Sequence, residues 1–142
     1  MTTSNTRLAP ITGDRAAAIS NAIVSLHRRR SGKGPTKAKT HVLDDVLLVV
    51  LENGSAPIER TLAEHGRADL VHEVRRSFQD AMGDAFIAVV ERETGRKVRA
   101  FLSQSHPDPD VSVEVFLLEP VEAGDKHDPP DADATRDGDG SR

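Results

Sequence analysis

Residues 12–119 alternate between a helical and a strand-like spacing of apolar side chains, and each change of spacing marks a new element. The first helix is predicted to begin at Thr12 or Asp14 and to end at Gly32, with apolar positions three and four residues apart at Ala16, Ile19, Ile23 and Leu26. Residues 36–43 and 46–52 then alternate as two strands. Asp44-Asp45 between them is a two-residue turn typical of a hairpin.

The second half of this region shows the same succession of a helix and a hairpin. Ser55 is a suitable N-cap for a short helix that ends at Gly66, and a long helix is predicted over residues 68–93. Residues 97–103 and 111–119 alternate as a second hairpin. The pattern predicts an α+β fold of order α-β-β-α-α-β-β, in which a four-stranded, mainly antiparallel sheet of two hairpins has helices packed on one face. This order of elements also resembles one helix–hairpin unit used twice, with a short helix inserted between the two copies.

Composition divides the chain into three parts. Residues 120–142 are rich in Pro, Gly and Asp and contain a single valine, so they cannot bury enough apolar surface to offset the entropy of ordering. We therefore expect a flexible N-terminus over 1–11, a single α+β domain over 12–119 and a disordered acidic tail over 120–142. The net charge is −4, but residues 15–43 carry seven Lys or Arg and no carboxylate.

The chain contains no cysteine, which excludes disulfides, thiolate nucleophiles and iron–sulfur clusters. Its longest apolar run, Val46 to Leu51, is far shorter than the roughly 20 residues that a membrane span needs, and the first residues contain no apolar signal segment. We expect a cytoplasmic protein without a membrane span, peripheral to the membrane only through a partner.

A basic stretch lies where the first helix turns into the first strand, and its six cations are Arg28, Arg29, Arg30, Lys33, Lys37 and Lys39. A nucleotide-binding Walker loop is disfavoured because that loop joins a strand to a helix, whereas here a helix precedes a strand. Two interpretations remain open. The residues end the helix and turn the chain, with arginines at the negative end of the helix dipole, or they form a contact surface for an anionic partner.

Catalytic and metal chemistry find little support in the residue pattern. No nucleophile, base and orienting group occur at a recognisable spacing, so we expect neither an enzyme nor a bound cofactor. His and Asp residues cluster in the two hairpin turns, but exposed turns commonly contain such residues, and we assign no metal site. Nucleic acid is disfavoured as well, because the chain has no Trp or Tyr and only four Phe for base stacking.

The apolar content of the strands predicts a homodimer. We expect the helices to cover the face that carries Ala38, Thr40 and Val42 in the first hairpin and Ala100, Leu102, Val113 and Val115 in the second. Phe101, Phe116 and Leu118 then lie on the opposite face, together with one side of residues 46–51. A monomer rarely leaves so large an apolar surface in water. A second copy across a two-fold axis is the simplest cover, with Phe101, Phe116 and Leu118 at the interface.

Several motifs resemble the MpsC-like family of small bacterial proteins, over Ile19 to Leu118. The resemblance is carried by Gly32-Lys33-Gly34-Pro35-Thr36-Lys37, Asp44-Asp45, Pro57-Ile58-Glu59, Arg75-Arg76 with Phe78, and Thr94-Gly95. The family name refers to the third component of a sodium-translocating, membrane-potential-generating system associated with cation and bicarbonate uptake. The resemblance implies a soluble, non-enzymatic accessory or regulatory protein that contacts a membrane transporter subunit, and it supplies no functional residues. The alternative is a ligand-sensing or nucleic-acid-associated module that uses the basic stretch over residues 28–39.

Overall fold

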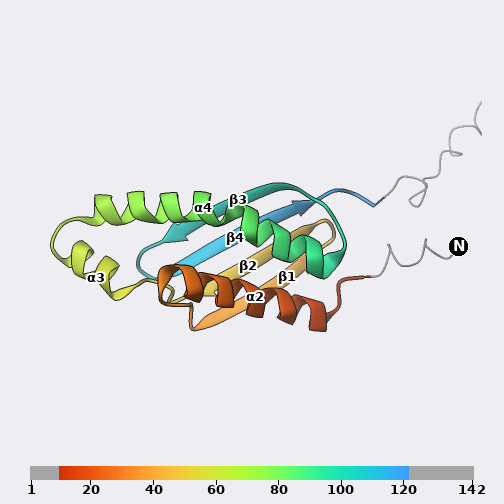
Figure 1. Ribbon diagram of the computed structural model, residues 1–142, viewed down its shortest axis with the longest axis horizontal. Helices are drawn as coiled ribbons and strands as arrows, with labels where there is room; N and C mark the ends of the chain where they lie inside the picture. Colours follow the sequence, from red (N-terminus) through yellow and green to blue (C-terminus); the bar gives the residue numbers. More distant parts are fainter. Residues whose placement is uncertain (1–9, 122–142) are drawn as a thin grey trace, which may run out of the picture.

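The computed structural model describes residues 10–121, so the predicted N-terminal arm and acidic tail fall almost entirely outside the described part of the chain. It confirms the predicted α+β fold and its order of elements (Figure 1). The elements are α2 (Gly13–Ser31), β1 (Lys37–Leu43), β2 (Val46–Glu52), α3 (Pro57–Glu64), α4 (Ala68–Thr94), β3 (Val98–His106) and β4 (Val111–Leu118).

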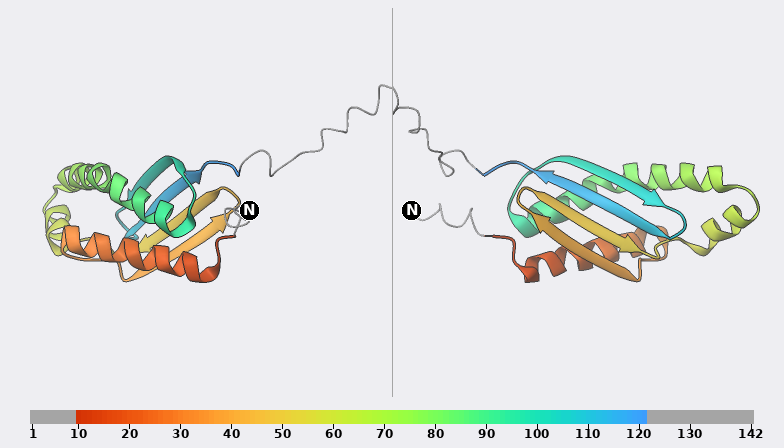
Figure 2. Two further views of the ribbon diagram at one scale, coloured as in Figure 1. Left: turned by 45° about the vertical axis from the view of Figure 1, so that its right-hand side comes forward. Right: turned by 180° about the vertical axis from the view of Figure 1, so that it is seen from behind.

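The four strands form one antiparallel sheet in the order β1-β2-β4-β3. Each hairpin occupies one half of the sheet, and β2 and β4 pair at the centre. This order is symmetric about the central pair, as expected if the α2 hairpin and the α4 hairpin are two copies of one unit. Helices α2 and α4 both lie on one face, and the view from behind shows the strands uncovered on the other (Figure 2).

The start of α2 and the ends of both long helices lie at residues that suit these positions. The side chain of Thr12 accepts a hydrogen bond from the backbone N–H of Arg15 at 3.2 Å, so Thr12, and not Asp14, caps α2. Gly32 and Gly95 end α2 and α4 with φ of 88° and 71°. Glycine adopts this left-handed conformation without the steric penalty that a Cβ would bring, so both helices end where the sequence predicts.

The hydrophobic core lies between the two long helices and the central strands β2 and β4. Ile19 and Ile23 of α2 and Val90 of α4 are fully buried against Leu47 and Val49 of β2. Phe86, Phe101 and Phe116 form an aromatic cluster beside them, with ring centroids 6.4 Å apart for Phe86–Phe101 and 5.0 Å for Phe101–Phe116. Aromatic pairs at such distances contribute about 0.5–1.5 kcal/mol each beyond their buried area.

The predicted face assignment of the second hairpin is wrong. Phe116 and Leu118 have no exposed surface and belong to the core, and Phe101 packs against that core. These three residues therefore face the helices and cannot form the interface predicted for them. Ala100 and Leu102 lie on the uncovered face, because a register shift between Val98 and Ala100 keeps Val98 with the core and reverses the alternation after it.

A polar contact joins α2 to β1 at the edge of this core. The hydroxyl oxygens of Ser20 and Thr40 are 2.7 Å apart, and each residue is only 8 % exposed. A buried hydroxyl that loses its partner costs about 1–3 kcal/mol, whereas removal of both hydroxyls can be nearly neutral.

We expect Thr40→Val to lower the free energy of unfolding by about 1–2 kcal/mol, because it leaves the Ser20 hydroxyl buried without this partner. The double variant Ser20→Ala with Thr40→Val should lose clearly less than the sum of the two single variants, by at least about 0.5 kcal/mol. Urea unfolding followed by circular dichroism measures all four proteins. Strict additivity would show that the two hydroxyls are not energetically coupled.

Candidate functional site

The helix-facing side of the sheet changes from apolar to polar beneath the N-terminal half of α4. Along β4 the inward-facing residues are Phe116 and Leu118 at one end and Ser112 and Glu114 at the other, preceded by Asp110 in the turn. Cross-strand pairing adds Ser103 opposite Glu114 and Ser105 opposite Ser112. A helix packed on a sheet normally meets apolar side chains, so this polar half marks a place that the core does not fill.

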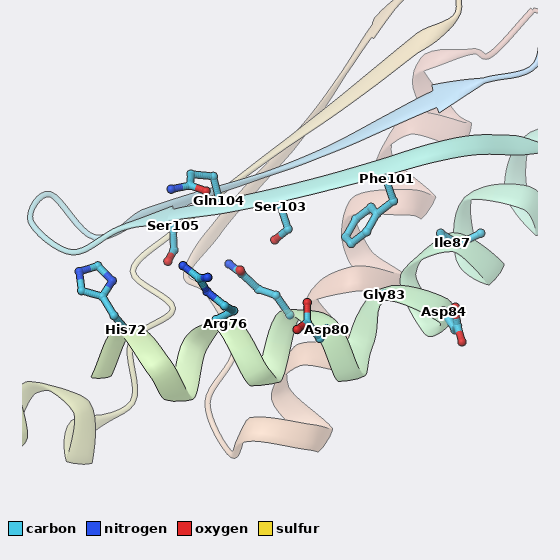
Figure 3. A pocket seen from close by; sticks show the side chains of 11 residues that line it. His72, Arg76, Asp80, Gly83, Asp84, Ile87, Phe101, Ser103, Gln104 and Ser105 are labelled. Carbon is cyan, nitrogen blue, oxygen red and sulfur yellow. The ribbon is translucent and has the colours of Figure 1, made fainter. Parts of the chain in front are cut away.

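Two hollows lie beside this polar half. The first is a groove of about 520 Å³ between α4 and β3, which is lined mainly by polar and charged side chains. Figure 3 shows Arg76 pointing from α4 towards the strand, and Ser103 and Ser105 pointing back towards the helix. Phe101 and Ile87 close the end nearest to the core (Figure 3).

The second hollow is a cavity of about 300 Å³ on the α2 side of α4. Ile58 and Val74 lie at its rim, and they are 67 % and 49 % exposed. Phe78 and Phe86 line it as well, and Glu114 supplies a carboxyl group from the sheet. The cavity therefore combines an apolar rim, aromatic walls and a buried acid.

Glu114 is the least expected of these residues, because it is 3 % exposed and its Oε1 has no hydrogen-bond partner within the described residues. Ser103, its cross-strand neighbour, also has a buried hydroxyl oxygen without a hydrogen bond of normal geometry in this part of the chain. Burial raises the pKa of Glu114 from 4.5 to about 7, and the nearby Ser103 hydroxyl lowers that pKa only in part. The carboxyl group is therefore about equally protonated and ionised near neutral pH.

A clamp of charged residues fixes the position of α4 beside the cavity. Arg75 of α4 lies 3.3 Å from Glu59 of α3 and 3.6 Å from Asp110 before β4. Arg75 also donates to the hydroxyl of Ser55, whose backbone N–H donates to Asp110 at 2.9 Å. Ser55 therefore serves this clamp and does not cap α3, which begins at Pro57 after Ala56. The two carboxylates more than neutralise Arg75.

His27 of α2 lines the same cavity. Burial lowers its pKa, against a smaller opposing effect of the hydrogen bond between Nδ1 and the carbonyl of Lys33. The imidazole ring also lies 5.1 Å from the ring of Phe78. His27 is therefore neutral at pH 7 and adds no positive charge near Glu114.

The uncovered face of the sheet is a second candidate surface. Pairing places Leu48 opposite Val115, Val50 opposite Val113 and Val46 opposite Leu117, all on this face. Leu102 of β3 and Leu43 of β1 extend the surface outward and are 54 % and 59 % exposed. No element among residues 10–121 covers these side chains. Contiguous apolar surface of this kind marks a place of association.

The basic residues predicted to bind a partner do not form one surface. Arg28, Arg29 and Arg30 are exposed in the last turn of α2, on the helix layer. Lys37 and Lys39 share the opposite face of the sheet with Glu52 and Val50, their partners across β1 and β2. Lys33 lies in the connection between them, and its ammonium group donates to the carbonyl of Asn53.

The His and Asp residues of the two hairpin turns remain without an assigned metal. In residues 10–121 no three His, Asp or Glu side chains are grouped so that they could hold an ion. No helix in the same range has the length and apolarity to cross a membrane.

Sequence reasoning missed both the cavity and the clamp. The one local indication of the cavity is the polar run at alternate positions, Asp110, Ser112 and Glu114, together with Ser103 and Ser105 in the paired strand. The assignment of Val113 and Val115 to the helix-covered face puts Glu114, which alternates with them, on the opposite side of the sheet. The clamp has no local pattern, since Arg75 lies 16 residues from Glu59 and 20 from Ser55 along the chain.

The raised pKa of Glu114 predicts an unusual dependence of stability on pH. Between about pH 4.5 and pH 7 the folded state binds more protons than the unfolded state, so the free energy of unfolding falls as pH rises through this window. The loss should approach roughly 3 kcal/mol and be complete above pH 7. Glu114→Gln should remove this component and be more stable than wild type at pH 8. Urea titrations from pH 4.5 to 8 measure the difference, and equal slopes for the two proteins would contradict it.

Comparison with known proteins places the chain in a family. The family model described as "Na+-translocating membrane potential-generating system (MpsC)" matches residues 12–120, which is nearly the whole described region. Searches of curated proteins and of solved structures returned no match. The match confirms the resemblance seen in the sequence motifs and implies a role in a system of several components. The chain belongs to the MpsC family.

Proposed function

We propose that this chain is a non-enzymatic accessory component of a membrane-potential-generating system, and that it acts as a homodimer that binds a membrane-embedded subunit from the cytoplasmic side. The family description, which names sodium translocation and the generation of a membrane potential, supports this setting. Our proposal extends the setting to cation and bicarbonate uptake. The observation that carries the mode of action is the uncovered apolar face of the sheet, because a surface of this chemistry is stable in water only when something covers it.

A second copy of the chain suits this face better than an unlike partner. The centre of the face consists of aliphatic side chains from β2 and β4, and its charged residues, Lys37, Lys39 and Glu52, lie on β1 or at the end of β2. A two-fold axis through the aliphatic centre would pair this surface with itself and leave the charges at the rim. Two sheets pack in this way in β-sandwiches, about 10 Å apart.

The size of the face also fits a dimer. Four strands about 4.8 Å apart and seven to nine residues long, at about 3.3 Å per residue, span roughly 500 Å². Two copies would bury roughly 1,000 Å² of this planar area, which is near the lower limit of specific interfaces. An interface of this size is compatible with a dimer whose population depends on protein concentration.

A ligand-sensing role is the second candidate, and the cavity beside Glu114 favours it. The nucleic-acid alternative is weakened because the six cations predicted to form one patch are divided between two faces. A continuous basic stripe is the usual electrostatic footprint of nucleic-acid binding.

Val115→Asp should convert the dimer to a monomer, because it places a charge at the centre of the uncovered face beside Leu48. Light scattering during gel filtration at about 50 µM measures the mass, and circular dichroism checks that the variant is folded. Val74→Asp is the matched control, since the same change is made at an exposed site on the helix layer, and it should remain dimeric.

Leu102→Asp, on the edge strand of the same face, provides a second variant that is less demanding for folding. A wild-type protein that is monomeric at 50 µM would contradict the dimer. A folded Val115→Asp variant that remains dimeric would place the interface elsewhere.

The exposed arginines of α2 are our candidate contact for the membrane-embedded subunit. Changing Arg28, Arg29 and Arg30 together to Glu should release the protein from the membrane fraction of its native cells at low ionic strength, because the change reverses three charges on one helix end. Lys37→Glu with Lys39→Glu is the control on the opposite face. Equal recovery of the arginine variant and wild type in the membrane pellet would contradict this assignment.

A further inference from the structure

The cavity between α2, α4 and the sheet has the composition of a small-molecule site, and it lies on the other side of the sheet from the proposed dimer surface. Its volume of about 300 Å³ is at the lower end of the range for small-molecule sites, roughly 300–1,000 Å³. Such sites combine apolar walls with a few fixed polar groups that orient the ligand. Here Phe78 and Phe86 provide the aromatic wall, and Oε1 of Glu114 is a buried acceptor without a hydrogen-bond partner among the described residues.

The charge balance of the cavity decides which ligand fits. The charged side chains that line it are Arg30 from α2, Glu59 from α3, Arg75 from α4, and Asp110 and Glu114 from the second hairpin. The clamp uses Arg75 to hold Glu59 and Asp110, and His27 is neutral because burial lowers its pKa. Arg30 is exposed at the end of α2. With Glu114 ionised the lining carries one net negative charge, from three carboxylates against two arginines.

The groove on the other side of α4 does not offset this charge. Its titratable residues are His72, Arg76, Asp80 and Asp84, all from α4, so its carboxylates outnumber its arginine (Figure 3). Gln79 and Ser105 line both hollows, and both side chains are neutral. Among residues 10–121, a positively charged ligand near Glu114 therefore meets no unpaired buried cation on either side of α4.

We propose that this cavity binds a small amphipathic amine, with its ammonium group on the Glu114 carboxylate and its apolar chain along Phe78 and Phe86 towards Ile58 and Val74. An ammonium donates to the unpartnered Oε1 and supplies the positive charge that the buried carboxylate lacks. The aromatic faces of Phe78 and Phe86 suit both a cation and an aliphatic chain. The exposed rim residues explain how such a chain could enter.

Amine binding should be coupled to the release of a proton from Glu114. Only the ionised carboxylate attracts the ammonium, and about half of the Glu114 side chains are protonated near pH 7. Affinity should rise roughly ten-fold between pH 6 and pH 8, because the ionised fraction rises by that factor. A site that held the amine only by apolar contact would show no such dependence.

Isothermal titration of the full-length protein with hexylamine tests the proposal, with hexanol and hexanoate as neutral and anionic probes of the same length. We expect hexylamine to bind at least ten-fold more tightly than hexanoate at pH 8, and its affinity to fall at pH 6. Glu114→Gln should reduce hexylamine binding at pH 8 at least ten-fold and abolish the pH dependence. Glu52→Gln is the matched control, because it makes the same change on the other face of the sheet.

Three results would overturn the proposal. They are the absence of hexylamine binding at millimolar concentration, a preference for hexanoate, and equal affinity of wild type and Glu114→Gln for hexylamine. The wild-type comparison of the three probes does not depend on any variant being folded. Light scattering on the same samples tests the dimer separately from amine binding. A protein that binds no hexylamine can still be a dimer, and a monomeric protein can still bind hexylamine.

Discussion

The pairing of β2 with β4 is the contact on which the other features depend, because it fixes which alternate residues face the helices. It places Leu47 opposite Phe116 and Val49 opposite Glu114 on the covered side. A shift of one residue would bring Val113 and Val115 under the helices and expose Phe116. Aliphatic content alone does not decide between these registers. The observed register brings three phenylalanines together, and two of them, Phe86 and Phe116, are almost completely buried. The stabilisation from this aromatic cluster offsets the cost of burying Glu114.

Sequence periodicity was sufficient for the elements and their order, because helix caps, glycine ends and alternating strands are local features. It was also sufficient for the first hairpin, where Ala38, Thr40 and Val42 face the helices as predicted. It failed for the second hairpin, whose more uniformly aliphatic side lies outward. Alternation reports that a strand has two different faces, but the choice between them depends on tertiary contacts with α4 that the strand's own pattern does not contain. The clamp and the cavity also arise from tertiary contacts between separate elements.

The two halves of α4 are held by different interactions. Its C-terminal half is anchored by Phe86, Val89 and Val90 in the core, and its N-terminal half by the ion pairs of Arg75 and few buried side chains. Burial of apolar surface contributes about 1.5–3 kcal/mol per large side chain, whereas ion pairs that remain partly hydrated contribute much less. The half of α4 above the cavity is therefore the less stable half, and local opening there costs less than opening of the core.

Glu114 connects this less stable region to the uncovered face through a single strand. Val113 and Val115, its neighbours in sequence, point to the opposite side of the sheet, so one segment of β4 forms part of both surfaces. If ionisation of Glu114 displaces the backbone of β4, it also displaces Val113 and Val115 on the outer face, because these residues adjoin Glu114 in the same strand. Thermodynamic linkage requires that such coupling be reciprocal: if occupancy of the cavity alters association through the outer face, association alters affinity in the cavity by the same factor. A buried acid that lowers stability is consistent with such a linkage, since at this position a neutral residue of similar shape would give a more stable fold.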